Sequence, residues 1–169
     1  MKKFFSQATL ICLISFVVAI TFNQFSASPL PILKPYKPAV VEELEQIKDG
    51  NGNPVSQHIQ NLDAELLKVL IENGEALLVD ARSEAEFLQK HIPSAINLPV
   101  TRFAEMYGEK EGLLQGKKVL VCYCSSEDCS DARLLAVRLY LKGHTDIFVL
   151  TGGIEAWEGE GNPVIANQP

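Results

Sequence analysis

Short apolar runs alternate with helix-like stretches over the C-terminal part of this chain. Residues 76–79 and 119–123 are continuous apolar runs, which are typical of strands buried on both faces, and residues 146–150 predict a third strand. Residues 83–90 and 130–142 have the pattern of helices. This alternation predicts an α/β domain whose mostly parallel central sheet carries helices on both faces.

A further helix is expected before the first of these strands, over residues 62–72. Its apolar residues recur at helical spacing: Leu62, Leu66, Val69 and Leu70. Asn61 is the expected N-cap, because its side chain can accept a hydrogen bond from the first turn. We therefore assign residues 61–169 to the folded domain.

The N-terminus has the order of an export signal, with Lys2 and Lys3 followed by a mostly apolar stretch over residues 4–22. We assign residues 1–27 to a signal anchor or signal peptide that begins with a hydrophobic helix. An uncleaved anchor is favoured, because Pro29 directly follows the best small-residue cleavage site. Residues 4–22 would then hold the protein in the membrane, with the domain on the extracytoplasmic (periplasmic or outer) face. Secretion after cleavage is the alternative.

The stretch between this segment and the domain, residues 28–60, reads as a proline-rich linker and lead-in. Its prolines deny a helix its backbone donors and favour an extended spacer: Pro29, Pro31, Pro35 and Pro38.

Composition narrows the possible ligands. The net charge of -6 and pI near 5.1 argue against nucleic acid, whose phosphates select basic surfaces. No bound cofactor is expected, since the glycine pair Gly152-Gly153 lacks the strand-to-helix pattern of a dinucleotide site.

The loop after the second apolar run is the strongest candidate for chemistry, because ligand sites of parallel sheets lie beyond the carboxyl ends of the strands. Cys124 opens this loop at the N-terminus of the next predicted helix, where backbone N–H groups favour a nucleophilic thiolate of lowered pKa. Cys122 lies inside the strand and is expected to be a buried structural residue. The loop continues through Ser125, Ser126, Glu127, Asp128, Cys129 and Ser130.

Four segments in order resemble the signatures of the rhodanese-like family. They are Asp80-Ala81-Arg82-Ser83 with Glu86, the run from His91 to Pro99, the Cys124 loop, and the segment from Gly152 to Trp157. The resemblance extends over about residues 61–163. It implies a sulfurtransferase without a cofactor, in which Cys124 takes sulfane sulfur from a small donor as a persulfide and passes it to a thiol or cyanide.

The resemblance also suggests supporting roles. The N–H groups of residues 125–130 would hold the persulfide sulfur, and Asp80 and Arg82 would brace the loop. A scaffold ion pair without catalytic effect is an equal alternative for Asp80 and Arg82. Glu86 belongs to the same signature, and His91 is expected to be a hydrogen-bonded scaffold residue.

Two kinds of departure from the family pattern are visible. Lys90 and Ser94 replace glycines. Within the loop, positions that often hold Arg or Lys in thiosulfate-using members are occupied here by Ser125, Glu127, Asp128 and Cys129. Carboxylates at the mouth would repel dianionic thiosulfate, so a neutral or thiol-bound donor is expected.

Cys129 leaves a second chemistry open. It could close a disulfide with Cys124, which would make the domain a thiol redox protein, or it could merely replace a loop arginine. A catalytically silent binding module is a third possibility, with an unidentified protein partner. A metal site is not expected, because Cys122 should lie within the sheet. A phosphatase is disfavoured, because the loop has no Arg to hold phosphate.

Overall fold

The computed structural model describes residues 44, 46–116, 118–127 and 129–166. The predicted signal segment, its hydrophobic helix and most of the proline-rich linker lie outside the described residues. Within the described ranges, no helix is both long enough and apolar enough to cross a membrane.

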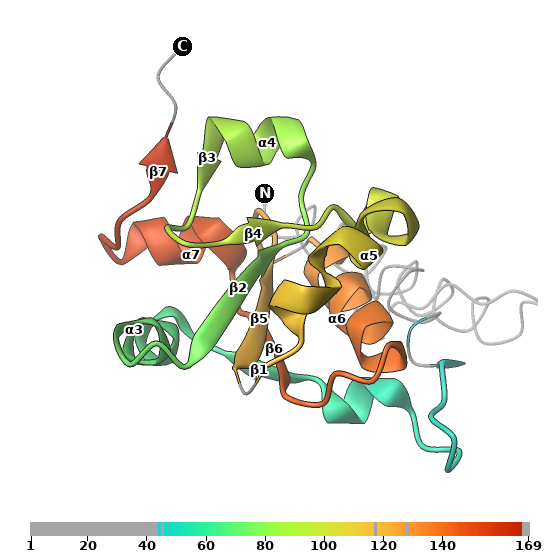
Figure 1. Cartoon of the computed structure of the whole chain (residues 1–169). Coiled ribbons are helices and arrows are strands. Elements are labelled where there is room, and N and C mark those ends of the chain that lie inside the picture. Colours follow the sequence, from blue (N-terminus) through green and yellow to red (C-terminus); the bar gives the residue numbers. More distant parts are fainter. Residues whose placement is uncertain (1–43, 45, 117, 128, 167–169) are drawn as a thin grey trace, which may run out of the picture. The chain divides into compact units, whose positions relative to one another are not determined.

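The core of the domain is a five-stranded sheet with the order β1-β6-β5-β2-β4 (Figure 1). All neighbouring strands in this sheet run parallel, which confirms the predicted sheet type. The strands are β1 (Gln60–Leu62), β2 (Ala76–Asp80), β4 (Ile96–Asn97), β5 (Val119–Tyr123) and β6 (Ile147–Leu150).

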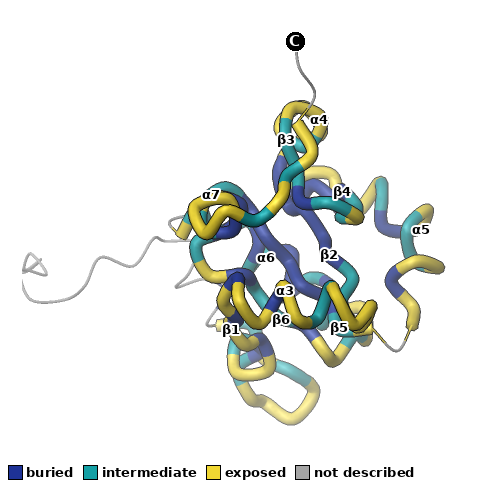
Figure 2. The backbone as a smooth tube through the Cα atoms, turned by 90° about the vertical axis from the view of Figure 1, so that its left-hand side faces the viewer, coloured by how far each residue is buried: buried dark blue, intermediate teal, exposed yellow. Residues whose placement is uncertain are grey.

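Helices cover both faces of the sheet, as expected. α3 (Ala64–Glu72) and α7 (Gly153–Gly159) lie on one side, and α5 (Phe103–Leu114) and α6 (Asp131–Leu141) lie on the other (Figure 1). Along β5, Leu120 and Cys122 enter the core beneath α5 and α6, whereas Val121 and Tyr123 enter the core beneath α3 and α7. This alternation buries the central strands almost completely (Figure 2).

A smaller substructure follows β2. α4 (Glu84–Gln89) begins with a capping box, in which the backbone N–H groups of Glu86 and Ser83 each donate to the other residue's side chain. The chain then forms β3 (Lys90–His91), which pairs antiparallel with β7 (Ile165–Ala166) in a second, two-stranded sheet. The short 3-10 helix η2 (Val100–Arg102) leads into α5.

The predicted start of the first helix is wrong. Leu62 belongs to β1, and the helix begins at Ala64 with Asp63, not Asn61, as the N-cap that accepts from the Leu66 N–H. Leu66 and Val69 are each 48% exposed, and Leu67 is the helix residue that packs in the core. The reason is tertiary: Asn61 pairs with Val149 of β6, which draws this segment into the sheet.

The packed unit also takes in part of the predicted lead-in. Leu44, Val55 and Ile59 are buried in the same core as α5 and α6. Val55 lies in the 3-10 helix η1 (Val55–His58). The core of the domain therefore includes residues that precede residue 61.

The backbone of the turn between β3 and β4 is strained at Ser94. Ser94 has a φ of +64°, in the left-handed region that favours glycine. Replacing it by glycine should raise the free energy of unfolding by roughly 0.5–1 kcal/mol, measured by urea denaturation. Ser56→Gly is the control, because Ser56 is outside the positive-φ set and should lose stability. A Ser94→Gly variant of lower stability would contradict this interpretation.

Candidate active site

Cys124 lies at the carboxyl end of β5, beneath a pocket of about 290 Å³. The loop contributes Cys124, Ser126, Glu127 and Cys129 to the pocket wall. The start of α6 and the segment between β6 and α7 complete it through Ala132, Arg133, Thr151 and Gly152. The pocket therefore occupies the edge of the sheet where parallel strands present their ligand sites.

Backbone N–H groups of the loop face both sulfur atoms. The N–H groups of Ala132 and Ser126 act on Cys124, and those of Asp131 and Ser125 act on Cys129. Each of these donors favours the charged form of the sulfur it faces. The loop and the first turn of α6 thus form a cradle for a negatively charged sulfur.

The two loop cysteines interact directly. The Cys124 thiol is only 2% exposed and donates to the carbonyl oxygen of Cys129 across 3.1 Å. Its hydrogen bond with the Cys129 side chain, followed by burial, raises the pKa of Cys124, while the same bond lowers the pKa of Cys129. The expectation of a lowered pKa at Cys124 is therefore wrong for the reduced pair, because the partly exposed Cys129 carries the charge more easily.

Helix α7 holds the Cys124 loop by its backbone. The N–H of Ile154 donates to the carbonyl oxygen of Cys124 at 2.9 Å, and the N–H of Glu155 donates to that of Ser125 at 3.1 Å. Gly153 permits this approach: a Cβ atom there would lie 2.4 Å from the Cys124 carbonyl oxygen. The sequence indicated only a turn at this glycine, because the close approach arises from segments far apart in the chain.

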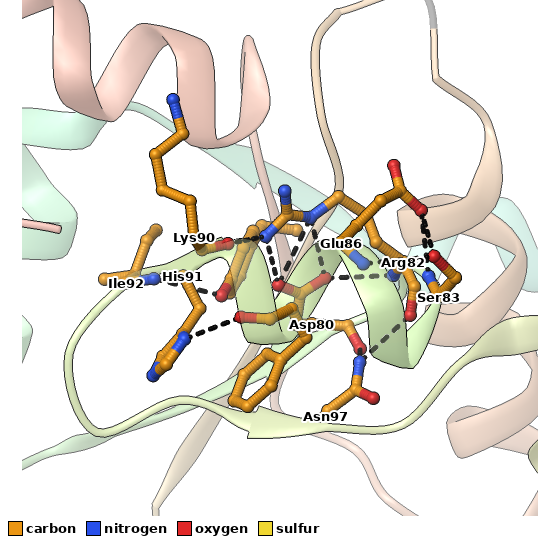
Figure 3. Close-up of polar contacts among 10 residues, drawn as sticks. Asp80, Arg82, Ser83, Glu86, Lys90, His91, Ile92 and Asn97 are labelled. Atoms are coloured by element: carbon orange, nitrogen blue, oxygen red, sulfur yellow. Dashed lines mark hydrogen bonds and ion pairs between the residues drawn. The ribbon is translucent and has the colours of Figure 1, made fainter. Parts of the chain in front are cut away.

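A buried ion pair lies at the end of β2 (Figure 3). The Nη2 atom of Arg82 is 2.6 Å from Oδ2 of Asp80, and its Nε donates to Oδ1 at 3.0 Å. Burial opposes the charge of the guanidinium, but the hydrogen bonds with Asp80 outweigh it and raise the pKa of Arg82. Arg82 also donates to the carbonyl oxygen of Lys90 at 2.7 Å, so the pair ties β2 to the segment after α4.

Tyr123 links this ion pair to Cys124, its neighbour in the chain. The Arg82 guanidinium carbon lies 5.7 Å from the Tyr123 ring centroid, and the Ala81 N–H donates to the Tyr123 carbonyl oxygen at 2.9 Å. Burial raises the pKa of Tyr123, so its phenol stays protonated. Asp80 and Arg82 therefore lie next to the residue that precedes Cys124, and their bracing of the loop stays a prediction.

Asn97 completes this network, although no role was predicted for its side chain from the sequence. Its Nδ2 donates to the carbonyl oxygens of Asp80 at 3.2 Å and Arg82 at 2.9 Å (Figure 3). No chemical signal in the sequence indicates this role, which follows from the pairing of β4 with β2.

Glu86 and His91 lie in different surroundings. The hydrogen bond from the Ser83 hydroxyl lowers the pKa of Glu86, whose carboxylate also interacts with the side chain of Ser125 in the loop. Nδ1 of His91 is 2.8 Å from the carbonyl oxygen of Phe87, and the two rings stack at 4.0 Å (Figure 3). His91 thus packs within the α4–β3 unit, as a scaffold residue would.

Charges of both signs surround the pocket. Glu127 and Arg133 line it, and Asp131 stands in the first turn of α6, where burial and the charge of Glu86 raise the pKa of Asp131. Arg133 donates to Oδ1 of Asn61 at 2.6 Å. Arg133 is not among the residues predicted from the sequence, although its place one turn after Ser130 on the predicted helix could have revealed it. Asp128 lies outside the described residues.

The remaining described cysteine is separate from the site. Cys122 is fully buried in β5, and burial raises the pKa of Cys122 far above that of a free thiol. All three cysteines in the described ranges are free thiols. Over those same ranges, no group of three or more His, Cys, Asp or Glu side chains is placed to hold a metal ion.

The contact at Gly153 generates a prediction. Gly153→Ala should lower the free energy of unfolding by about 2–4 kcal/mol, because it adds both a steric clash and an unfavourable positive φ. Alkylation of Cys124 by iodoacetamide should also change in rate, since the loop must move. Gly159→Ala, in the same helix with open space around it, should leave both measurements nearly unchanged. Equal effects of the two substitutions would refute the proposed contact.

Known proteins are similar to this chain in sequence and in fold. Residues 63–160 match the family model of the rhodanese-like domain. The chain is 36% identical over 106 residues to the HTH-type transcriptional regulator Rv0324 of Mycobacterium tuberculosis, covering 63% of this chain and 44% of that protein. It is 32% identical over 115 residues to a sulfurtransferase of Allochromatium vinosum, covering 64% of this chain and 96% of that protein.

The fold has close structural relatives as well. The crystal structure of the BH2092 protein from Bacillus halodurans is similar with a TM-score of 0.57 and 28% identity, over 63% of this chain and 77% of that one. The chain spans less than half of the Mycobacterium regulator but nearly all of the Allochromatium sulfurtransferase. Together with the matched family model, this shows that the chain belongs to the rhodanese-like domain family.

Proposed function

We propose that this domain is a sulfurtransferase that carries sulfane sulfur as a persulfide on Cys124. The observation that carries the proposal is the position of Cys124 at the base of a pocket, with the N–H groups of Ser126 and Ala132 directed at its sulfur. A relative named as a sulfurtransferase, of which this chain covers 96%, adds support.

The reaction has two balanced steps. The Cys124 thiolate attacks the outer sulfur of a donor R–S–SH, forms the S–S bond of the persulfide and expels the donor thiolate RS⁻. An acceptor thiolate or cyanide then attacks the outer sulfur of that persulfide and releases the Cys124 thiolate. In both steps negative charge stays near the loop N–H groups, whose preorganised dipoles would stabilise it.

The charges at the pocket favour a thiol-bound donor. Glu127 lines the pocket, and the carboxylates of Glu86 and Asp131 lie near the loop. Among these four groups, the guanidinium of Arg133 carries the one positive charge. A dianion such as thiosulfate would be repelled by this balance. We therefore infer that the donor is a neutral or singly charged persulfide.

We also infer that the domain is held on the extracytoplasmic face of a membrane by residues 4–22, with secretion after cleavage as the alternative. The support is the order of Lys2, Lys3 and the apolar segment. Where the domain resides stays a prediction.

The proposed persulfide predicts which cysteine is the nucleophile. Cys124→Ser should abolish sulfur uptake from glutathione persulfide, measured as sulfur retained on the protein by intact mass plus sulfide released, because a serine hydroxyl cannot form a persulfide. Cys122→Ala is the matched control and should keep uptake, since Cys122 is sealed inside β5. Sulfur uptake that survives Cys124→Ser would contradict the proposal. Parent protein that neither retains sulfur nor releases sulfide, but forms a disulfide on exposure to peroxide, would favour a thiol redox protein. Parent protein that does none of these would favour a binding module.

The charges at the pocket predict how the domain selects its donor. Glu127→Gln should raise kcat/KM for thiosulfate roughly fivefold at low ionic strength, since a unit charge acting on a dianion across a wet pocket contributes about 1 kcal/mol. The gain should shrink as salt is added. Glu75 lies before β2, at the opposite end of the sheet, so Glu75→Gln should change neither kcat/KM for thiosulfate nor its dependence on salt. An unchanged kcat/KM in Glu127→Gln would remove the electrostatic argument.

A further inference from the structure

Cys129 lies where a second nucleophile could reach Cys124. The Cys124 thiol donates to the carbonyl oxygen of Cys129 across 3.1 Å, and the two side chains interact electrostatically. Both residues line the same pocket, and Cys129 is the more exposed of the two. No persulfide transfer to an external acceptor requires this second thiol.

The backbone holds Cys129 at this place. Its N–H donates to the carbonyl oxygen of Ser126 at 3.3 Å, which folds the loop into a turn that returns toward Cys124. Ser130 follows as the residue before α6. The N–H groups of Asp131 and Ser125 face the Cys129 sulfur and favour its thiolate, the form that attacks disulfides and persulfides.

We propose that Cys129 resolves the Cys124 persulfide by attacking its inner sulfur, closing a Cys124–Cys129 disulfide and releasing the transferred sulfur as hydrosulfide. This inference rests on the proposed persulfide at Cys124. It deepens that function, because the domain would then reduce sulfane sulfur to sulfide instead of only passing it on.

The step balances without an external oxidant. The Cys129 thiolate forms a bond to Sγ of Cys124, and the bond between that Sγ and the outer sulfur breaks. The outer sulfur leaves with the electron pair and its proton as HS⁻, so the sulfane sulfur is reduced while both cysteines become a disulfide. The N–H groups of Ser126 and Ala132 act on the Cys124 sulfur, from which the anion departs.

The resulting disulfide defines the class of partner. Two electrons and two protons must be returned before the next cycle, and a dithiol reductant supplies them by thiol–disulfide exchange. Cys129 lines the pocket of about 290 Å³ and is partly exposed, so a thiol that enters the pocket can reach it. A dithiol would therefore be the physiological co-substrate, whereas a monothiol acceptor would suffice for simple sulfur transfer.

The test follows the fate of one transferred sulfur. The full chain, in a Cys12→Ala background so that the counted thiols lie in the domain, is reduced and loaded with one equivalent of glutathione persulfide. Released sulfide is quantified as its bimane derivative, and the protein is analysed by intact mass and by sequencing of the peptide that contains Cys122, Cys124 and Cys129. The same series is run on Cys129→Ser and on Cys122→Ala.

The parent is expected to release about one equivalent of sulfide and to form a Cys124–Cys129 disulfide. Because the attack is intramolecular, the parent should release sulfide at least roughly tenfold faster than loaded Cys129→Ser. Loaded Cys129→Ser should retain the added sulfur, and Cys122→Ala should behave like the parent. A dithiol should then restore the parent for a second round.

Two outcomes separate the hypotheses. If the parent gains sulfur and keeps it as a stable persulfide, the resolving role of Cys129 is overturned and the sulfurtransferase proposal stands. If neither the parent nor Cys122→Ala ever gains sulfur or releases sulfide, the sulfurtransferase proposal itself fails. A disulfide that joins Cys122 to either loop cysteine would also overturn the assignment of Cys129.

Discussion

The site depends on the hydrogen bonds between the start of α7 and the backbone of the Cys124 loop. The carbonyl oxygens of Cys124 and Ser125 are held by the N–H groups of Ile154 and Glu155, and only glycine at position 153 allows this approach. With these carbonyls fixed away from the pocket, the following N–H groups remain available to the sulfur atoms. The segment from Gly152 to Trp157 thus shapes the site without contributing a reacting side chain, and the buried Trp157 anchors it in the core.

Support from the other side comes through the buried pair of Asp80 and Arg82. Burying two charges is favourable only when their hydrogen bonds are satisfied, and here the guanidinium reaches both carboxylate oxygens and the Lys90 carbonyl oxygen. The pair fixes Tyr123 at the end of β5 and hence the start of the loop. The pair therefore lies next to the residue that precedes Cys124, and a role in positioning the loop stays a prediction.

Placing two thiols within one loop changes the electrostatics of the site. A single cysteine in the cradle would have its pKa lowered by the N–H groups, whereas in the pair one proton is shared and the more exposed Cys129 takes the negative charge. The family resemblance leads us to expect an arginine or lysine in this loop of thiosulfate-using members, which would offer a fixed positive charge instead. With a thiol in place of that charge, the loop loses its attraction for an anionic donor and gains a second nucleophile. The same substitution therefore accounts for both the proposed donor class and the proposed release of sulfide.

The sequence by itself determined the α/β class, the strands β2, β5 and β6, the helices α4 and α6, and the candidate nucleophile, because these features follow from local apolar runs and from signatures contiguous in the chain. Tertiary structure decided the rest. β1 is too short to be recognised alone and exists through its pairing with β6, which displaced the start of α3 and exposed Leu66 and Val69. The contact of Gly153 with Cys124, the links from Asn97 to Asp80 and Arg82, and the charge shift between Cys124 and Cys129 all depend on distances between residues, and local pattern carries no information about those distances.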